Sequence, residues 1–197
     1  MVRPREFDRD EVLQRAIEVF WAKGFAATST DDLLQAMGIG RQSLYNAFGD
    51  KRRLYVDALQ AYQQKVVGEH LTRLNAPSSP LEGIKALLIG LIAENDRVRG
   101  LGCMGVGSVG EFGANDEELA GLRSKVTSIL GSRIIERIKE GQANGEIDAS
   151  LDPEQSSAFV QVTMTGLQLA ARGGGAFVDL RSTATFATEF LRARQGV

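Results

Sequence analysis

One short segment in the first quarter of the chain carries side chains that suit contact with DNA. Arg41 can pair bidentately with guanine, and Gln42 and Asn46 can pair with adenine in the same way. Ser43 and Tyr45 carry hydroxyl groups that suit donation to phosphate, which positions a protein on the duplex without reading its sequence. These residue types at this spacing predict a helix that enters the major groove.

Charge is distributed unevenly along the chain. The net charge is −2, which by itself argues mildly against nucleic acid as a partner. From Arg41 to Arg53, however, four cations face one acid, a local charge of +3, whereas 12 basic and 15 acidic residues from Ala76 onward give −3. A locally basic segment joined to an acidic remainder is expected of a DNA-binding domain carried on a domain with another role.

Three consecutive cations occupy the first turn of a helix that is expected to begin at Lys51. The helix dipole disfavours positive charge there, so a negative group should offset Lys51, Arg52 and Arg53. A DNA phosphate held by Lys51 and the backbone N–H groups of that turn would do so. Solvated surface charge is the alternative for the two arginines. Arg3 and Arg5, ahead of the first helix, fit either an arm on the DNA or a disordered tail.

The elements that position these groups are all predicted to be helices. Apolar residues recur at helical spacing, Gly24 suits the end of the first helix, and Gly38 suits a tight turn before Arg41. The pattern predicts a helix, a short turn and a second helix. We expect an all-α fold of about nine helices, because no strand pattern is found. The first helix is expected from residue 8 or 9 to 23, and the others over residues 30–37, 41–48, 51–74, 81–95, 99–113, 116–141, 153–172 and 178–194.

The residues around this turn follow a pattern known from one family. They are Gly24-Phe25 after the first helix, a hydroxyl residue before the second, Leu33 and Ala36 within it, Gly38-Ile39 at the turn, and Ser43-Leu44-Tyr45 and Phe48 before Lys51. In these residues the chain resembles the N-terminal DNA-binding domain of the TetR family. Gly40, Ala47 and Gly49 depart from the family pattern, in which Ser or Thr, an aromatic residue or histidine, and proline are usual, respectively.

The resemblance implies a transcriptional regulator and not an enzyme. Its expected partners are a palindromic double-stranded DNA operator, a second copy of the chain, and a small, largely apolar effector whose arrival releases a repressor from DNA. Residues 1–54 would form the helix-turn-helix domain and residues 55–197 a larger helical domain for ligand binding and dimerisation, with the helix over 51–74 linking the two. The expected DNA-contacting residues are Thr28, Thr30, Arg41, Gln42, Ser43, Tyr45, Asn46 and Lys51.

The larger domain offers two sets of apolar residues at helical spacing. Either set also fits an ordinary internal core, because a core face and a functional face read alike in sequence. The expected dimer interface comprises Phe159, Val162, Gly166, Leu169, Phe186 and Phe190. The expected effector site comprises Tyr62, Leu88, Leu91, Met104, Phe112, Ile129 and Phe159.

The chain has one cysteine and one histidine. Cys103 fits either a buried thiol without a role or a thiol that senses electrophiles, which is the alternative function. His70 is expected at the surface. No Cys/His/carboxylate cluster has metal-ligand spacing, so no metal or cofactor is expected. No catalytic motif is found, and a helical enzyme would require polar residues gathered in the cavity.

The absence of an apolar leader or of an apolar stretch near 18 residues argues against secretion and membrane spanning. The single cysteine fits a reducing compartment. We therefore expect a cytoplasmic protein.

Overall fold

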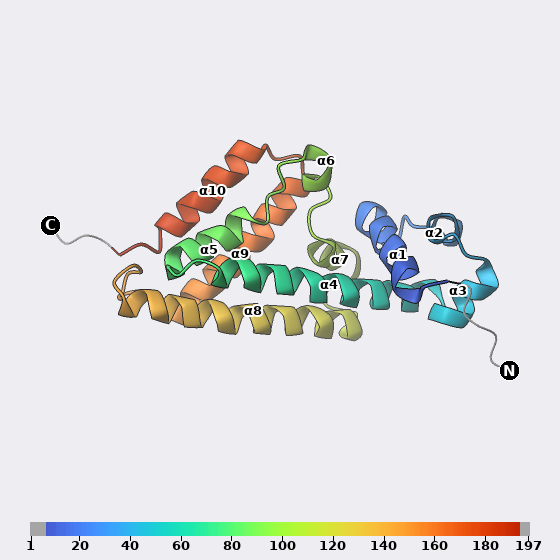
Figure 1. Cartoon of the computed structure of the whole chain (residues 1–197), viewed down its shortest axis with the longest axis horizontal. Helices are drawn as coiled ribbons and strands as arrows, with labels where there is room; N and C mark the ends of the chain where they lie inside the picture. Colours follow the sequence, from blue (N-terminus) through green and yellow to red (C-terminus); the bar gives the residue numbers. More distant parts are fainter. Residues whose placement is uncertain (1–6, 194–197) are drawn as a thin grey trace.

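The computed structural model describes residues 7–193, and within that range the chain forms ten helices and no strand (Figure 1). The expected all-α fold is confirmed. One of the ten helices, α6, is a single turn of four residues, which accounts for the difference from the expected nine. Arg3 and Arg5 lie outside the described residues.

The first three helices have the predicted bounds: α1 (Arg9–Lys23), α2 (Thr30–Met37) and α3 (Arg41–Phe48). Local signals explain this agreement. The Ser29 side chain caps α2 by accepting from the backbone N–H of Asp32, whose carboxylate accepts from the Ser29 N–H in return. Gly24 ends α1 with a positive φ of 80°. Gly40 precedes α3 without a side-chain cap, as its departure from the family pattern implies.

The long helix α4 (Lys51–Asn75) runs from this head into the body of the molecule, where α5 (Pro80–Ile89) turns back beside it. The prediction that α5 continues to residue 95 was wrong. After Ile89 the backbone hydrogen bonds link residues three apart, as in a 3₁₀ helix, and not four apart. Leu91 N–H donates to the Leu88 carbonyl, and Ile92 N–H donates to the Ile89 carbonyl. The Asn95 side chain then caps the next helix.

The glycine-rich stretch is two helices, α6 (Asp96–Arg99) and α7 (Met104–Phe112), not the single helix predicted over 99–113. Gly102 lies between them with a φ of 60°, and a β-carbon there would lie only 2.9 Å from the Gln168 carbonyl oxygen. The chain therefore needs glycine at this close approach and cannot continue as a regular helix.

Three helices complete the body: α8 (Glu117–Ala143), α9 (Pro153–Arg172) and α10 (Phe177–Glu189). The last helix ends before the predicted residue 194. Its following residues leave the helix to pair with an earlier loop: Asp148 N–H donates to the Leu191 carbonyl, and Ala193 N–H donates to the Glu146 carbonyl.

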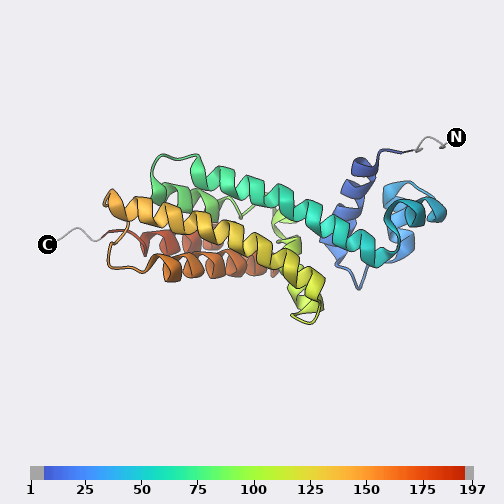
Figure 2. The ribbon, with the colours of Figure 1, turned by 90° about the horizontal axis from the view of Figure 1, so that it is seen from below.

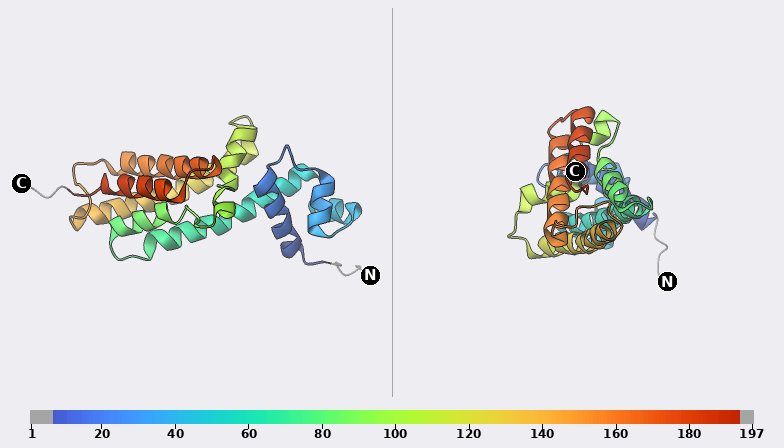
Figure 3. Two further views of the ribbon diagram at one scale, coloured as in Figure 1. Left: turned by 90° about the horizontal axis from the view of Figure 1, so that it is seen from above. Right: turned by 90° about the vertical axis from the view of Figure 1, so that its left-hand side faces the viewer.

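The molecule is elongated, with the head α1–α3 at one end (Figure 1). Helices α4 and α8 run side by side along the body, and the start of α8 points back towards the head (Figure 2). Helix α10 packs alongside α9 on one side of the body (Figure 3). No helix in the described range 7–193 is long and apolar enough to cross a membrane.

Two hydrophobic clusters hold the fold together. One fills the body, with residues from the end of α4 and from α5, α8, α9 and α10. The other fills the head, but it also takes in Tyr55 to Tyr62 of α4 together with Met104 of α7 and Leu119 of α8. A boundary after residue 54 would therefore pass through the core of the head.

Candidate nucleic-acid interface and cavity

Helix α3 has one buried face and one exposed face. Leu44 and Phe48 are buried in the head cluster and fix the helix against it. Arg41, Gln42 and Asn46 lie on the opposite, exposed face at helical spacing. The side chains predicted to read bases are therefore presented together to the outside.

The contacts that these exposed groups make within the chain are weak. The Arg41 guanidinium lies 2.8 Å from the Asp31 carboxylate, and both side chains are exposed. The Gln42 amide donates to the Asn46 side-chain oxygen at 2.9 Å. Exposed pairs of this kind contribute about 0–1 kcal/mol, so base edges can replace them at little cost.

Three of the four hydroxyl side chains that were predicted to contact DNA are accessible. Tyr45 is exposed on α3, and Ser43 and Thr30 are half-buried at the starts of α3 and α2. Thr28 is a correction, because its side chain is only 1% exposed and its hydroxyl donates to the Gly24 carbonyl. That hydroxyl closes the turn between α1 and α2, while Ser29 caps α2.

The cations at the start of α4 have partners within the chain. The Lys51 ammonium lies 4.3 Å from the centre of the Phe25 ring, a cation–π contact. The Arg52 guanidinium lies 2.7 Å from the Asp116 carboxylate, and Arg53 lies 3.1 Å from Glu118.

A carboxylate at the start of α8 therefore offsets Arg52 within the chain, where the sequence suggested DNA phosphate or solvent. The side chain of Arg53 is 60% exposed and lies near Glu118 of α8 and Asp57 of α4, so the alternative of solvated surface charge still holds for it. The Arg52–Asp116 ion pair also ties the head to the body, because α8 belongs to the body.

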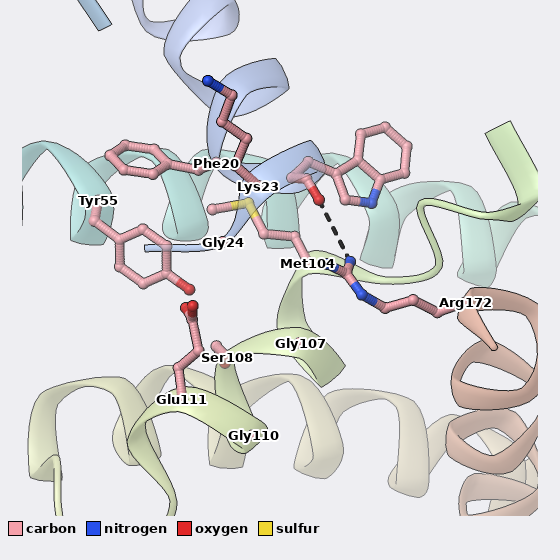
Figure 4. Close-up of a pocket in the computed structure, with 11 residues that line it drawn as sticks. Phe20, Lys23, Gly24, Tyr55, Met104, Gly107, Ser108, Gly110, Glu111 and Arg172 are labelled. Carbon is pink, nitrogen blue, oxygen red and sulfur yellow. Dashed lines mark hydrogen bonds between the residues drawn. The ribbon is translucent and has the colours of Figure 1, made fainter. Parts of the chain in front are cut away.

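A second junction between head and body is formed by α7 (Figure 4). The Glu111 carboxylate accepts hydrogen bonds from the backbone N–H groups of Phe25 and Ala26, at 2.8 and 3.2 Å. Two successive N–H groups in a turn form a concave site for an anion. Figure 4 shows Tyr55 directed towards the same carboxylate, and burial together with Glu111 raises the pKa of Tyr55.

The junction also encloses a cavity of about 220 Å³ between α1, α4, α7 and α9. The Arg172 guanidinium at its edge (Figure 4) donates to the Trp21 and Leu101 carbonyls. The Trp21 indole N–H donates to the Gly102 carbonyl at 3.0 Å. Helices α7 and α9 therefore both contact α1, the first helix of the head.

A larger cavity of about 580 Å³ lies in the body between α4, α7, α8 and α9. Of the residues predicted to bind an effector, Tyr62 and Leu91 line it, and Met104 lines the smaller cavity instead. Its lining comprises Tyr62, Gln63, Val66, Val67, His70, Leu91, Cys103, Gly105, Val106, Val109, Arg123, Val126, Thr127, Leu130, Gln161, Val162, Met164, Thr165, Gly166 and Gln168.

The other four predicted effector residues line neither cavity. Leu88 is fully buried in the body cluster. Phe112 packs its ring against Phe25 in the head. Ile129 is half exposed on α8, and Phe159 packs against Phe190. Their helical spacing was correct, but it reports an apolar face and not what that face contacts.

One face of helix α7 borders the large cavity, and another borders the head. Gly105, Val106 and Val109 line the large cavity, whereas Ser108 and Glu111 line the junction with the head. A change in the cavity that moved α7 would therefore also displace the Glu111 carboxylate from the turn between α1 and α2.

The residues predicted to form a dimer interface lie on the outside of the chain. Val162, Leu169, Phe186 and Phe190 are 58–75% exposed, and Gly166 has no atom near the position of an added β-carbon. These side chains therefore do not belong to the internal core.

The single cysteine, Cys103, and the single histidine, His70, both line the large cavity. Cys103 is half-buried at the start of α7. His70 is only 8% exposed, so the expected surface position was wrong, and burial lowers its pKa to about 4. No group of three or more His, Cys, Asp or Glu side chains in the described chain could hold a metal ion.

The three-helix head and the exposed face of α3 define a helix-turn-helix DNA-binding protein. Residues 12–58 match the family described as bacterial regulatory proteins, tetR family. The uncharacterized HTH-type transcriptional regulator YezE of Bacillus subtilis (strain 168) is 36% identical over 149 residues, 75% of this chain and 77% of YezE. The HTH-type transcriptional repressor ComR of Escherichia coli (strain K12) is 26% identical over 184 residues, 92% of this chain and 88% of ComR.

Solved structures agree with the sequence relatives. A cysteine mutant of the TetR family transcriptional regulator CifR, complexed with 26bp double-strand operator DNA, matches with a TM-score of 0.77 and 28% identity over 96% of this chain and 99% of that chain. A TetR transcriptional regulator from Chloroflexus aurantiacus J-10-FL shares the fold, with a TM-score of 0.81 and 21% identity over 94% and 96% of the two chains. The chain therefore belongs to the TetR family, and it is a DNA-binding transcriptional regulator, not an enzyme.

Proposed function

We propose that this chain is a repressor that binds a palindromic operator as a homodimer and leaves it when a small, largely apolar molecule enters the large cavity. The observation that carries the proposal is that the same helices connect the cavity to the DNA-binding head. Helices α4 and α7 each line the cavity and also contact the head that presents α3. The similarity to ComR, a transcriptional repressor, supports repression as the sign of regulation.

In the proposed complex, α3 of each copy lies in the major groove, with successive grooves about 34–36 Å apart. Arg41, Gln42 and Asn46 contact base edges. The proposed phosphate contacts are made by Thr30, Ser43, Tyr45 and Lys51. Residues 1–54 carry the proposed DNA contacts, residues 55–197 bind the effector and the second copy, and the first half of α4 is shared because it completes the core of the head.

The proposed dimer forms through α9 and α10. Its support is the exposed apolar face that Val162, Leu169, Phe186 and Phe190 make on these two helices. Several large apolar side chains exposed on two packed helices are costly to leave in water, and a second copy would cover them.

Effector binding releases DNA by moving the heads relative to one another. The route is α4, which carries Tyr62, Val66 and His70 on the cavity and Lys51 at the DNA side. A coupling of about 1–3 kcal/mol between the two sites is enough for a 5- to 150-fold change in operator affinity.

The experiment that tests this proposal is a binding selection from genomic fragments with the purified chain, followed by affinity measurements at stated salt concentrations. We expect one palindrome to be enriched. Arg41→Ala should relax the choice of base at one position in each half-site, and Lys51→Ala should weaken all sites alike and reduce the salt dependence. Lys125→Ala, an exposed cation on α8, is the charge-matched control.

If no sequence is enriched over a wide range of salt, the proposed function is wrong. An equal effect of Lys125→Ala and Lys51→Ala would show that Lys51 acts only through overall charge and would remove the start of α4 from the interface, and an unchanged base choice in Arg41→Ala would remove α3.

A second candidate function is a thiol sensor, which the position of Cys103 on the large cavity favours. In this mechanism, alkylation or oxidation of the thiol would replace reversible effector binding. Cys103→Ser separates the two hypotheses, because a reversible sensor keeps its response to the effector and a thiol sensor loses its response to electrophiles.

A further inference from the structure

The large cavity carries one formally charged side chain, and that charge is positive. Arg123 lines it from α8, whereas no Asp or Glu side chain is among its lining residues. His70 also lines it and is neutral at pH 7, because burial keeps its pKa low. Transfer of an uncompensated cation into such a cavity is unfavourable, and a neutral or anionic guest is favoured.

Arg123 has donor capacity left for a guest. In the described chain its guanidinium bonds to two neutral oxygens, the Gly113 carbonyl at 2.5 Å and the Ser108 hydroxyl at 3.5 Å, and to no carboxylate. A guanidinium carries five N–H donors and matches a carboxylate with two parallel hydrogen bonds. Ser108 and Gly113 do not line the large cavity, and these two bonds use two of the five donors, so the remaining N–H groups are available to a carboxylate in the cavity.

Gln63 gives a second, independent indication. Its side chain is only 8% exposed, it lines the cavity from α4, and its amide has no hydrogen-bond partner among the described residues. The amide nitrogen lies 3.5 Å from where a β-carbon on Gly105 would be, so it reaches the start of α7. The amide atoms are not among the enclosed unpaired polar atoms of the described chain, so they border the cavity and are free to bond to a guest.

The rest of the cavity is apolar. Val66 and Val67 of α4, Val126 and Leu130 of α8 and Met164 of α9 provide hydrocarbon walls. The volume of about 580 Å³ lies within the range of small-molecule sites. The site thus combines polar donors with room for a hydrocarbon body.

We propose that the effector is an amphipathic organic anion, a carboxylate bound by Arg123 and Gln63 with its hydrocarbon part against the valine-rich walls. This inference rests on the proposed function, because it assigns a ligand class to the cavity through which the operator would be released.

The test uses three eight-carbon probes on the full chain: octanoate, 1-octanol and octylamine, each below its aggregation concentration. Calorimetry measures binding, and fluorescence anisotropy measures release of the selected operator. Octanoate should bind at least tenfold more tightly than octylamine and should release the operator. Arg123→Gln should weaken octanoate binding at least tenfold and leave octanol binding within twofold.

Gln63→Leu keeps the apolar packing and should weaken octanoate binding severalfold, which guards against a fold defect in the arginine variant. Lys125→Gln, two residues along α8 and exposed, has the same net charge as Arg123→Gln and should bind octanoate normally. The inference is overturned if octanoate does not bind, if the three probes bind alike, or if Lys125→Gln weakens octanoate binding as much as Arg123→Gln.

The two proposals fail in different ways. A chain that binds its operator but ignores octanoate disproves the ligand class alone. A chain that selects no operator disproves the proposed function, and calorimetry still decides whether the cavity binds the anion.

Discussion

Replacement of Gly24 by alanine should reveal the contact between the head and α7. Gly24 has φ 80° and ψ 175°, a conformation that costs other residues about 1–3 kcal/mol. An alanine β-carbon would also lie 2.5 Å from a Glu111 carboxylate oxygen. That carboxylate must then move and lose its hydrogen bonds to Phe25 and Ala26, which, discounted for exposure, costs about 1 kcal/mol. The expected loss in the free energy of unfolding is about 2–4 kcal/mol.

The assay is urea unfolding of four variants, with Gly113→Ala as the matched control. Gly113 also has a positive φ, 57°, but an added β-carbon there would meet nothing within 4 Å. Gly113→Ala should therefore show the backbone cost alone. In the Glu111→Ala background, Gly24→Ala should cost about 1 kcal/mol less than in the unmodified chain, because the displaced carboxylate is already gone.

Additivity of Gly24→Ala and Glu111→Ala would refute this reasoning. The alanine side chain would then leave the Glu111 carboxylate in place, and the contribution of that carboxylate to the turn would be read from Glu111→Ala alone.

Three further predictions concern stability and assembly. Burial depresses the pKa of His70 from 6.5 to about 4, so as the pH falls the unfolded state binds this proton before the folded state does. Between pH 6.5 and about 4 the folded state therefore loses about 3 kcal/mol of stability. His70→Gln, which removes the single histidine, should flatten the unfolding free energy between pH 7 and 5.5, and an unchanged slope would contradict the assignment. Leu44→Ala removes a fully buried side chain and should cost about 2–5 kcal/mol in urea unfolding, and a loss below 1 kcal/mol would show that α3 does not depend on it. Phe186→Asp should change the free energy of unfolding by no more than about 0.5 kcal/mol at a concentration where the chain is monomeric. Sedimentation at higher concentration should show a weakened dimer, and an unaffected dimer would mean that the interface lies elsewhere.

The sequence predicted the head well because its signals are local. Ser29 and Asp32 are three residues apart and cap α2 by themselves, and Gly24 and Gly38 end helices through their own backbone freedom. These interactions need no knowledge of distant segments. The bounds of α1, α2 and α3 could therefore be read directly.

Contacts between distant segments could not be predicted in this way. The partner of Arg52, Asp116, lies 64 positions along the chain, and Glu111 lies 86 positions from Phe25. The prediction that Thr28 contacts DNA failed for another reason, because only the geometry of the turn shows that its hydroxyl donates to the Gly24 carbonyl.

The cavity was the hardest feature to predict. Tyr62 and Val66 face it and Leu88 faces the core, yet all three follow the same helical spacing. The one signal available was Gln63, a long polar residue beside an apolar stripe, because such a residue is seldom buried without a reason.

The extension of the head core into the body sets a limit on domain exchange. A chimera that joined residues 1–54 to the body of another regulator would place foreign side chains where Met104 and Leu119 complete the head core. It would also lose the carboxylate of Glu111 from the turn at Phe25. The transplantable unit is therefore not a continuous stretch of sequence. A working exchange needs the first half of α4, all of α7 and the start of α8 to accompany the head.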